Sequence, residues 1–377
     1  MIYLDNAATG FPKPESVVDA VTDCIKNYCG NPGRGSHELA LASAEKIYEC
    51  REALSDFFSL GSPERVVFTQ NATHSINLVI KGLLRPGDHV ILSDMEHNSV
   101  FRPIYRMAKE NGIRFDIFPT HPEERIVDNV KRLMRRNTKL VICTHAPNIS
   151  SAVLPIAEIG ELCRNRGVVF ALDAAQSAGH LPINMNEMKI DALCLPGHKG
   201  LCGIQGCGAL CLGEGMFLST LTEGGNGINS LEADMPELSP ERYETGTLPT
   251  PSIVGLLQGV REVVSTGVER IRKHEVALWH MGYEALMRLG GVEVYEPDCA
   301  GAVLLFNING LPSDRVASEL GRVGVCVRGG YHCSALGHKT LKTPLGGAVR
   351  ISFGLYNNEQ DINGLIDALA HIKRKAE

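Results

Sequence analysis

Short apolar runs alternate with amphipathic stretches from about residue 65 to residue 213. Two of the stretches, residues 99–112 and 155–167, carry apolar side chains at helical spacing and end at glycine. The apolar runs are short and rich in β-branched residues, which is typical of buried strands. The predicted strands are residues 65–69, 89–94, 114–119, 139–146, 168–173, 192–196 and 208–213. Strands that alternate with helices predict a mostly parallel sheet with helices on both faces.

The pattern changes after residue 250. Residues 251–289 are helical in period but interrupted by glycines, which predicts a helix that leaves the sheet region. The remaining elements no longer alternate regularly, so they predict a smaller α+β unit. They are apolar runs at 292–297, 302–310 and 349–357 and helices at 313–323 and 359–374, and one more helix is predicted at 14–29. We expect a large domain of residues 15–255 and a small domain formed by residues 1–14 and 256–377.

Composition and charge narrow the class of protein. The chain has 377 residues, 44% of them hydrophobic and 21% charged, with a net charge of -6, so no basic surface for nucleic acid is expected. No apolar run approaches the roughly 18 residues that cross a bilayer, and the start lacks the pattern of a secretory signal. We therefore expect a cytoplasmic protein that acts on small molecules and contacts neither nucleic acid nor membrane.

The 12 cysteines are scattered along the chain, which favours free thiols over a disulfide framework. Cys202, Cys207 and Cys211 lie close together in sequence, but their spacing is not the paired pattern of zinc sites. We expect ordinary thiols there and no metal.

Unusual polar residues follow the predicted strands. Asp173 ends one apolar strand, and Lys199 lies in the glycine-rich turn 196–200 after another. Ligands of open parallel sheets bind at the carboxyl ends of the strands, and a buried carboxylate needs a cation or hydrogen bonds. Pyridoxal phosphate needs a lysine Schiff base and an acidic partner for its ring nitrogen, and these two residues fit both roles. The alternatives are that Asp173 only caps the next segment and that Lys199 is a surface turn lysine.

A phosphate group would need its own site. Residues 66–83 read as a strand, a polar turn and a helix, so the N–H groups near Ala72 and Thr73 would lie at a helix N-terminus suited to an anion. The alternative is that Asn71 or Thr73 only caps the helix. His97 follows the strand at 89–94, where its ring could stack on the cofactor and exchange protons, unless it is a structural histidine.

Several motifs together carry a resemblance. They are YLDNAAT (3–9), NPGRGSHE (31–38), THAPNISSAVLPI (144–156), LDAAQSAGH (172–180), PGHKG (196–200), YETGT (243–247), RGGYHCS (328–334) and RISFGLYNN (350–358). The chain resembles, over essentially its whole length, NifS-like cysteine desulfurases and selenocysteine lyases of the class V aminotransferase superfamily. The resemblance implies a fold-type I pyridoxal phosphate enzyme, with a seven-stranded, mostly parallel sheet in an α/β/α sandwich and a smaller α+β C-terminal domain.

The resemblance also implies residue roles around the cofactor ring. Lys199 would form the Schiff base and Asp173 would pair with the pyridinium. Gln176 would donate to the phenolic oxygen, and His97 would stack on the ring.

Other roles concern the phosphate and the substrate. Ala72, Thr73 and His198 would hold the phosphate, joined by Thr247 of the neighbouring subunit in a homodimer. Asn148, Arg328 and Arg350 would bind the substrate, with the Arg350 guanidinium clamping its carboxylate. The chain departs from many relatives at Pro196, where serine is common, and at His74, where acidic or polar residues are common.

Cys333 separates desulfuration from transamination, since a desulfurase needs a thiolate to attack the substrate sulfur. It lies near Arg328, His332 and His338 in sequence, and these could lower its pKa if they converge in space. The resemblance implies a short-loop, group II-like desulfurase that converts L-cysteine to L-alanine, forms a persulfide on Cys333 and passes sulfur to an acceptor protein. Other readings are a selenocysteine lyase, an aminotransferase or lyase in which Cys333 is idle, and a sulfur-relay scaffold without turnover.

Overall fold

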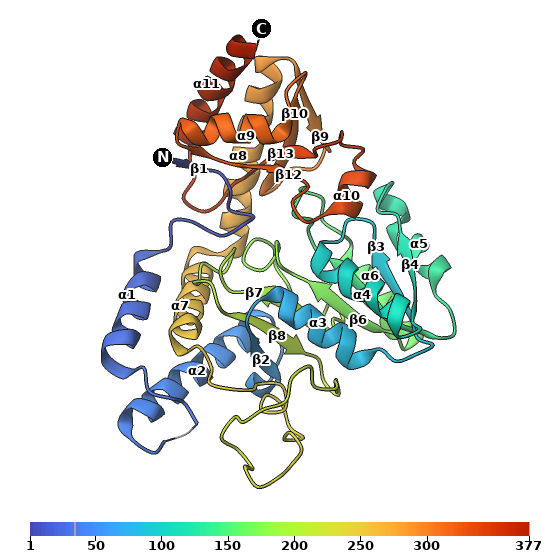
Figure 1. The fold of residues 1–377 in the computed structure, drawn as a ribbon, viewed down its shortest axis with the longest axis vertical. Coiled ribbons are helices and arrows are strands. Elements are labelled where there is room, and N and C mark those ends of the chain that lie inside the picture. The colour runs from blue at the N-terminus through green and yellow to red at the C-terminus, as the bar shows by residue number, and fades with distance from the viewer. Residues whose placement is uncertain (34, 377) are drawn as a thin grey trace.

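The computed structural model describes residues 1–33 and 35–376. Its largest element is a seven-stranded sheet in the order β2–β8–β7–β6–β5–β3–β4 (Figure 1). In that order the strands are Val66–Thr69, Gly208–Leu212, Ala192–Pro196, Val169–Asp173, Thr138–Thr144, His89–Ser93 and Arg114–Phe118. All neighbours from β7 to β4 pair in parallel, and only β8 runs antiparallel to its neighbours. This pairing confirms the prediction of a mostly parallel sheet. Each strand also lies within two residues of its predicted position.

Side chains of the sheet alternate between two apolar clusters, as the pleat of a strand requires. Val66 and Phe68 pack into one cluster, whereas Val67 packs into the other. The first cluster contains residues of α2 (Glu38–Phe57), α5 (Ile126–Leu133), α6 (Ile156–Arg166) and α7 (Thr250–Thr266). The second contains residues of α3 (Ala72–Leu83) and α4 (Asn98–Glu110). The expected α/β/α sandwich is therefore confirmed.

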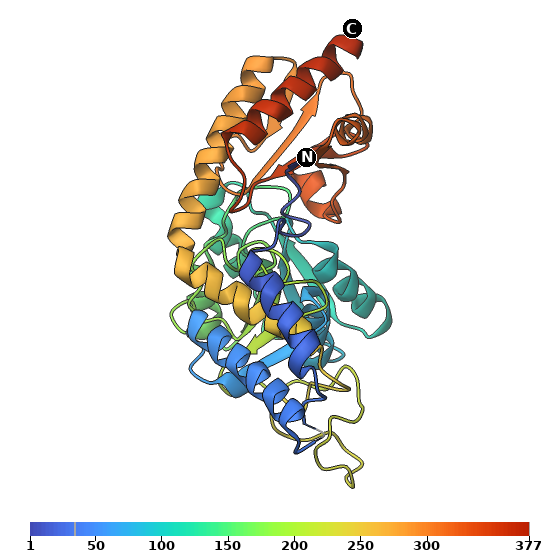
Figure 2. The same cartoon turned by 90° about the vertical axis from the view of Figure 1, so that its left-hand side faces the viewer.

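The C-terminal part has its own sheet and core. Strands β12 (Arg328–Gly330), β13 (Ala348–Ser352), β10 (Val303–Ile308) and β9 (Val292–Tyr295) form an antiparallel sheet in that order. Its core includes residues of α8 (Val268–Leu289), α9 (Ser313–Arg322) and α11 (Glu359–Ala376). Figure 2 shows α8 running along one side of the molecule from the large sheet region to this smaller one. The smaller α+β unit is thus present as expected.

The chain ends and short elements complete the fold. The N-terminal strand β1 (Ile2–Tyr3) pairs in parallel with β11 (Val325–Cys326), which brings the first residues to the C-terminal part. The predicted helix at 14–29 is α-helical as α1 (Glu15–Asp23), packs on α7 and continues as a π-helical turn, Cys24–Tyr28. The remaining elements are α10 (Ala335–Thr340) and the 3₁₀ turns Pro63–Arg65 and Glu123–Arg125.

The predicted boundary between the two domains lies within a continuous helix. The boundary between residues 255 and 256 lies inside α7, and the helical stretch breaks instead at Gly267, whose φ of +87° separates α7 from α8. The limits of 15–255 and 256–377 therefore stay a prediction. None of the helices among the described residues is long and apolar enough to span a membrane.

Candidate active site

One cavity collects the polar residues that follow the strands of the large sheet. All predicted cofactor-binding residues except Thr247 line it: Ala72, Thr73, His97, Asn148, Asp173, Gln176, His198 and Lys199. The same cavity is lined by Asn71, Met95, Ser99, Thr144, Ala175 and Pro196. These residues meet because the carboxyl ends of parallel strands lie at one edge of a sheet. Residues as far apart in sequence as Asn71 and Lys199 thereby form a single site.

Lys199 and Asp173 bring an amino group and a carboxyl group to this cavity. The Asp173 side chain is buried, and its Oδ1 accepts a hydrogen bond from the Ala175 N–H at 2.9 Å. Burial raises the pKa of Asp173, while that N–H and the nearby Lys199 lower it. Burial also lowers the pKa of Lys199 to about 8, although Asp173 acts in the opposite direction. A lysine with this pKa is partly neutral near neutral pH, which is the form that attacks a carbonyl group.

Glycines bring two turns into backbone contact around Lys199. A Cβ added at Gly200 would lie 2.4 Å from the Ala178 carbonyl oxygen, and one added at Gly179 would lie 2.4 Å from the Gly200 carbonyl oxygen. The turns after β6 and β7 therefore touch where no side chain fits. A Cβ at Gly10 would lie 3.0 Å from the Lys199 carbonyl oxygen, so the N-terminal segment packs over the same turn.

The N-terminus of α3 points its first turn into the cavity region. Asn71 is the N-cap, and its side chain accepts a hydrogen bond from the His74 N–H at 3.0 Å. Asn71 therefore caps the helix and also lines the cavity. Since Ala72 and Thr73 begin the helix, their N–H groups have no acceptor inside it and are available to an anion. Thr73 lines the cavity as well.

His198 borders the same end of the cavity. Its Nδ1 lies 3.0 Å from Thr9 Oγ1, and its carbonyl oxygen accepts a hydrogen bond from Lys13 Nζ at 2.8 Å. Burial lowers the pKa of His198 to about 4, so the ring is neutral at physiological pH. Pro196 also lines the cavity and brings neither a hydroxyl nor an N–H group.

His97 is the N-cap of α4. Its Nδ1 accepts a hydrogen bond from the Ser99 N–H at 3.0 Å, so the ring proton resides on Nε2. Burial lowers the pKa of His97 to about 4, with Lys199 and Arg328 adding to the effect. The residue therefore has the structural role left open by the sequence, and it also lines the cavity.

Arg350 lies on β13 and is not among the residues that line the Lys199 cavity. Its Nη2 pairs with Asp5 Oδ1 at 2.6 Å, and its Nη1 donates to the Asn148 carbonyl oxygen at 3.1 Å. Two buried polar atoms here have no hydrogen-bond partner among the described residues, Arg350 Nε and Asn148 Oδ1. Buried polar atoms are normally paired. A ligand that accepts from the guanidinium and donates to the amide would satisfy both.

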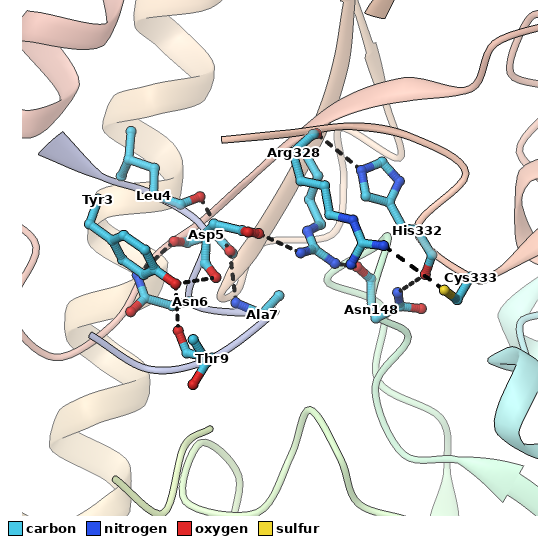
Figure 3. Close-up of polar contacts among 12 residues, drawn as sticks. Tyr3, Leu4, Asp5, Asn6, Ala7, Thr9, Asn148, Arg328, His332 and Cys333 are labelled. Carbon is cyan, nitrogen blue, oxygen red and sulfur yellow. Dashed lines mark hydrogen bonds and ion pairs between the residues drawn. The ribbon is translucent and has the colours of Figure 1, made fainter. Parts of the chain in front are cut away.

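Cys333 is exposed on the loop between β12 and α10. Arg328 Nη2 lies 3.9 Å from its Sγ, and the Asn98 N–H donates to its carbonyl oxygen at 2.7 Å. Cys333 lines a second cavity, which shares Thr73, His97 and Ser99 with the Lys199 cavity. The predicted neighbours separate in space, since Arg328 points to the thiol (Figure 3) and His332 points to the Arg328 carbonyl oxygen, 3.1 Å away.

Gln176 and Thr247 differ in placement, because Gln176 lines the cavity and Thr247 does not. Gln176 donates through Nε2 to the Ala7 carbonyl oxygen at 2.9 Å. Thr247 is exposed, lies outside the cavity and has its Oγ1 3.3 Å from Asn31 Nδ2, so its role in a neighbouring subunit stays a prediction. Arg34 of the 31–38 motif lies outside the described residues. Cys207 and Cys211 are buried, while Cys202 is partly exposed.

Two acidic residues near the site, Asp5 and Glu96, could not be recognised from the sequence pattern. Asp5 holds Arg350, and its only signal was its place in the YLDNAAT motif. Glu96 is 1% exposed, and its Oε1 accepts hydrogen bonds from the Ser93 hydroxyl and, at 3.0 Å, from the Thr144 N–H. Burial raises the pKa of Glu96 to about 8, and the neighbouring Asp173 raises it further. Its signal was its place directly before His97 after a strand.

Replacing Glu96 by glutamine tests this burial. In the unfolded chain the pKa of Glu96 is near its ordinary value of 4.5, whereas in the folded protein Glu96 stays protonated up to about pH 8. The unfolded state thus binds fewer protons in this window, so Glu96 lowers the free energy of unfolding as pH rises, by about 1.4 kcal/mol per pH unit. We expect Glu96→Gln, which cannot ionise, to be more stable relative to wild type at pH 8 than at pH 5 in urea denaturation.

The control for this experiment is Glu158→Gln, on an exposed position of α6. The relative stabilities of Glu158→Gln and wild type should not change between the two pH values. If Glu96→Gln behaves in the same way, Glu96 ionises normally in the folded protein and the argument from its burial is wrong.

Comparison with known proteins places the chain in a family. The model of the family described as Aminotransferase class-V matches residues 2–365. A probable cysteine desulfurase of Methanothermobacter thermautotrophicus is 34% identical, over 98% of this chain and 94% of that protein. A cysteine desulfurase of Haloferax volcanii is 32% identical, over 98% and 88%. The apo structure of the cysteine desulfurase from Thermococcus onnurineus superposes with a TM-score of 0.92 at 31% identity, covering 99% of this chain and 95% of that one. With its sheet, its strand-end cavity and these relatives, the chain belongs to the class-V aminotransferase family.

Proposed function

We propose that the protein is a pyridoxal phosphate-dependent cysteine desulfurase, which converts L-cysteine to L-alanine and transfers the sulfur to Cys333. One observation carries the proposal. The cavity that contains Lys199 and Asp173 and the cavity that contains Cys333 share a wall formed by Thr73, His97 and Ser99. A lysine for substrate activation and a thiol for sulfur removal are therefore neighbours.

The residues present fit pyridoxal phosphate. Asp173 is a buried carboxylate with one N–H donor, which leaves it free to accept from a protonated ring nitrogen. The first turn of α3, with Thr73 and His198 beside it, suits the phosphate. Arg350 Nε and Asn148 Oδ1 are buried atoms that have no hydrogen-bond partner in the described part of the chain. When bound, the cofactor supplies an electron sink that stabilises negative charge at the substrate α-carbon.

Side chains in the cavity and near Lys199 would bind and orient the substrate. Arg350 would hold the substrate carboxylate, because its guanidinium is fixed by Asp5 and still has an unpaired N–H. Arg328 pairs in register with Arg350 across β12 and β13, and its guanidinium lies 3.9 Å from the Cys333 thiol, where it would add positive charge. Lys199, whose pKa burial lowers to about 8, would take the α-proton as a general base. His97 would cover the ring while its Nε2–H remains available as a donor.

Cys333 would carry out the sulfur step. Its thiolate attacks the substrate sulfur, so that a sulfur–sulfur bond forms and the bond between the β-carbon and sulfur breaks. The electron pair of the broken bond stays with the carbon skeleton, which takes up a proton and leaves as alanine. The enzyme keeps a persulfide on Cys333, from which an acceptor protein would remove the outer sulfur. The exposure of Cys333 supports access by such an acceptor.

The assembly is also part of the proposal. Thr247 is exposed and lies outside the cavity of its own chain, which supports a homodimer in which it reaches the phosphate of the neighbouring subunit. The absence of a membrane-spanning helix among the described residues is compatible with a cytoplasmic enzyme.

The test is alanine formation from L-cysteine and from L-selenocysteine by the purified holoenzyme, measured side by side. We expect alanine from L-cysteine together with one persulfide per active site, detected by mass spectrometry after alkylation. Alanine from L-selenocysteine alone would identify a selenocysteine lyase. Production of a keto acid without alanine from either substrate would identify an aminotransferase.

A further inference from the structure

The backbone at Cys333 needs support from its surroundings. His332 and Cys333 have φ values of +52° and +58°, so two consecutive residues with side chains adopt the left-handed conformation that favours glycine. Such conformations persist only where surrounding contacts determine them. The contacts that hold this loop therefore decide where the thiol lies.

The large sheet region holds the loop through its backbone. The Asn98 N–H donates to the Cys333 carbonyl oxygen, and Asn148 Nδ2 donates to the His332 carbonyl oxygen, both at 2.7 Å. The Ser334 hydroxyl also reaches the Glu96 carbonyl oxygen at 3.4 Å. These bonds leave the His332 ring, which is buried, to make its own contacts.

The His332 ring begins a series of hydrogen bonds whose protons can be assigned. Its Nε2 lies 3.1 Å from the Arg328 carbonyl oxygen, and a carbonyl only accepts, so Nε2 carries the proton. Burial lowers the pKa of His332 to about 3, and Arg350 and Arg328 contribute. The ring is therefore neutral and its Nδ1 is an acceptor.

The second ring continues the series. His338 is 2% exposed, and its Nε2 lies 3.1 Å from His332 Nδ1, so His338 Nε2 must donate. Burial lowers the pKa of His338 to about 4, so this ring is also neutral and its Nδ1 accepts from Thr343 Oγ1 at 2.8 Å. The two ring planes lie within 13° of each other with centroids 5.4 Å apart, which is compatible with a hydrogen bond between the rings.

We propose that Thr343, His338 and His332 form a one-way hydrogen-bond chain to the Arg328 carbonyl oxygen, and that His338 thereby positions Cys333. This histidine chain ties both ends of the loop together, because its last acceptor belongs to the residue whose guanidinium lies 3.9 Å from the Cys333 thiol. Both histidines are positioning residues, since each is neutral and its N–H is engaged in the histidine chain. The hydrogen-bond chain itself does not depend on the proposed function. Only its purpose, to hold the Cys333 thiol where it can attack the substrate sulfur, rests on that function.

Two substitutions at His338 separate hydrogen bonding from packing. The His338 ring lies edge to face with Tyr331, with centroids 5.4 Å apart, so His338→Phe preserves an aromatic ring but removes the N–H donor. His338→Gln removes the ring, while its amide group can donate from the position of Nε2. If His338 acts by packing alone, His338→Phe should stay closer to wild type than His338→Gln. If His338 acts through the histidine chain, His338→Gln should stay closer to wild type.

The experiment measures the holoenzymes in two ways. Hydrogen exchange of the peptide spanning residues 328–343 should become about tenfold faster in His338→Phe and stay within about twofold of wild type in His338→Gln. The kcat for alanine formation should fall about ten- to a hundredfold in His338→Phe with little change in KM, because small displacements of a reacting group have effects of this size. His371→Phe, at an exposed position on α11, is the control.

The outcomes distinguish the inference from the proposed function. Equal exchange in His338→Phe and His338→Gln, whether slow or fast, would overturn the histidine chain. If His338→Phe does not fold, Thr343→Val removes the first donor without changing its shape, and Thr343→Ser restores it. Faster exchange in Thr343→Val but not Thr343→Ser would support the chain, and no difference would overturn it. A wild-type enzyme that forms no alanine would refute the desulfurase proposal while the exchange measurements still decide on the chain.

Discussion

Replacing Lys199 by alanine is expected to abolish both covalent attachment of pyridoxal phosphate and turnover of L-cysteine. The side chain lies in the cavity beside Asp173, and burial lowers its pKa to about 8. Its amino group makes no hydrogen bond or ion pair among the described residues, so it is free to react. We expect kcat to fall by a factor of roughly 10⁴ or more, because loss of the general base alone costs about 10²–10⁴. Alanine formation and the visible absorbance of the bound cofactor are the measurements.

Lys13 is the competing amine, and it makes the experiment specific. Burial lowers its pKa to about 8 as well, but its Nζ donates to the His198 carbonyl oxygen at 2.8 Å. Borohydride reduction of the wild-type holoenzyme should therefore label the peptide that contains Lys199, and peptide mass spectrometry would detect the label. Lys13→Ala should retain this label, and Lys199→Arg should lose it although a positive charge remains beside Asp173. A label on Lys13 in wild type would contradict our assignment of the Schiff base.

The sheet could be predicted from sequence because all its strands except β4 are buried almost throughout. Runs such as ALCLP at 192–196 are apolar throughout, short and bounded by turns, which leaves few other interpretations. The ligand-binding edge then follows from topology, since parallel strands bring Asp173 and Lys199 together. The limits of the first helix were less predictable. Residues 14–29 keep helical spacing to the end, although the hydrogen bonds change from α to π at Cys24.

Some features of the site could not be predicted from the sequence, because they depend on long-range contacts and on the direction of side chains. Asp5 pairs with Arg350 across 345 positions, and no local pattern records such a contact. Glu96 reads as an ordinary polar residue after a strand, because burial of a carboxylate is a property of the folded chain. His332 adjoins Cys333 in sequence, but its ring turns to His338 and away from the thiol. Proximity in sequence therefore identified the loop but not the direction of its side chains.

Replacing Cys333 by alanine is expected to leave the bound cofactor unchanged while alanine formation from L-cysteine falls about a hundredfold or more. Cys333 lines the cavity next to that of Lys199 but not the Lys199 cavity itself, so cofactor binding does not require its thiol. The sulfur step does require it, since without a thiolate no group accepts the substrate sulfur. The measurements are the absorbance of the holoenzyme, alanine formation and the mass of the alkylated protein.

Two other cysteines provide matched controls for this substitution. Cys29 is exposed like Cys333, so Cys29→Ala tests whether any accessible thiol suffices. Cys202 lines a separate cavity that also includes Lys199, but burial raises its pKa to about 11, which keeps it protonated and unreactive. Both variants should form alanine at the wild-type rate. Loss of activity in Cys202→Ala would instead assign the sulfur step to Cys202, in the separate cavity that it shares with Lys199.

The same variants decide between the chemical alternatives. Selenium leaves carbon more easily than sulfur, so a lyase could release it without a nucleophilic thiol. Turnover of L-selenocysteine that survives Cys333→Ala, with turnover of L-cysteine that does not, would show that the thiolate is needed only for sulfur. Unchanged alanine formation from L-cysteine in Cys333→Ala would remove Cys333 from the mechanism. The exposure of Cys333 and the position of the Arg328 guanidinium 3.9 Å from its thiol would then have to serve a purpose other than sulfur transfer.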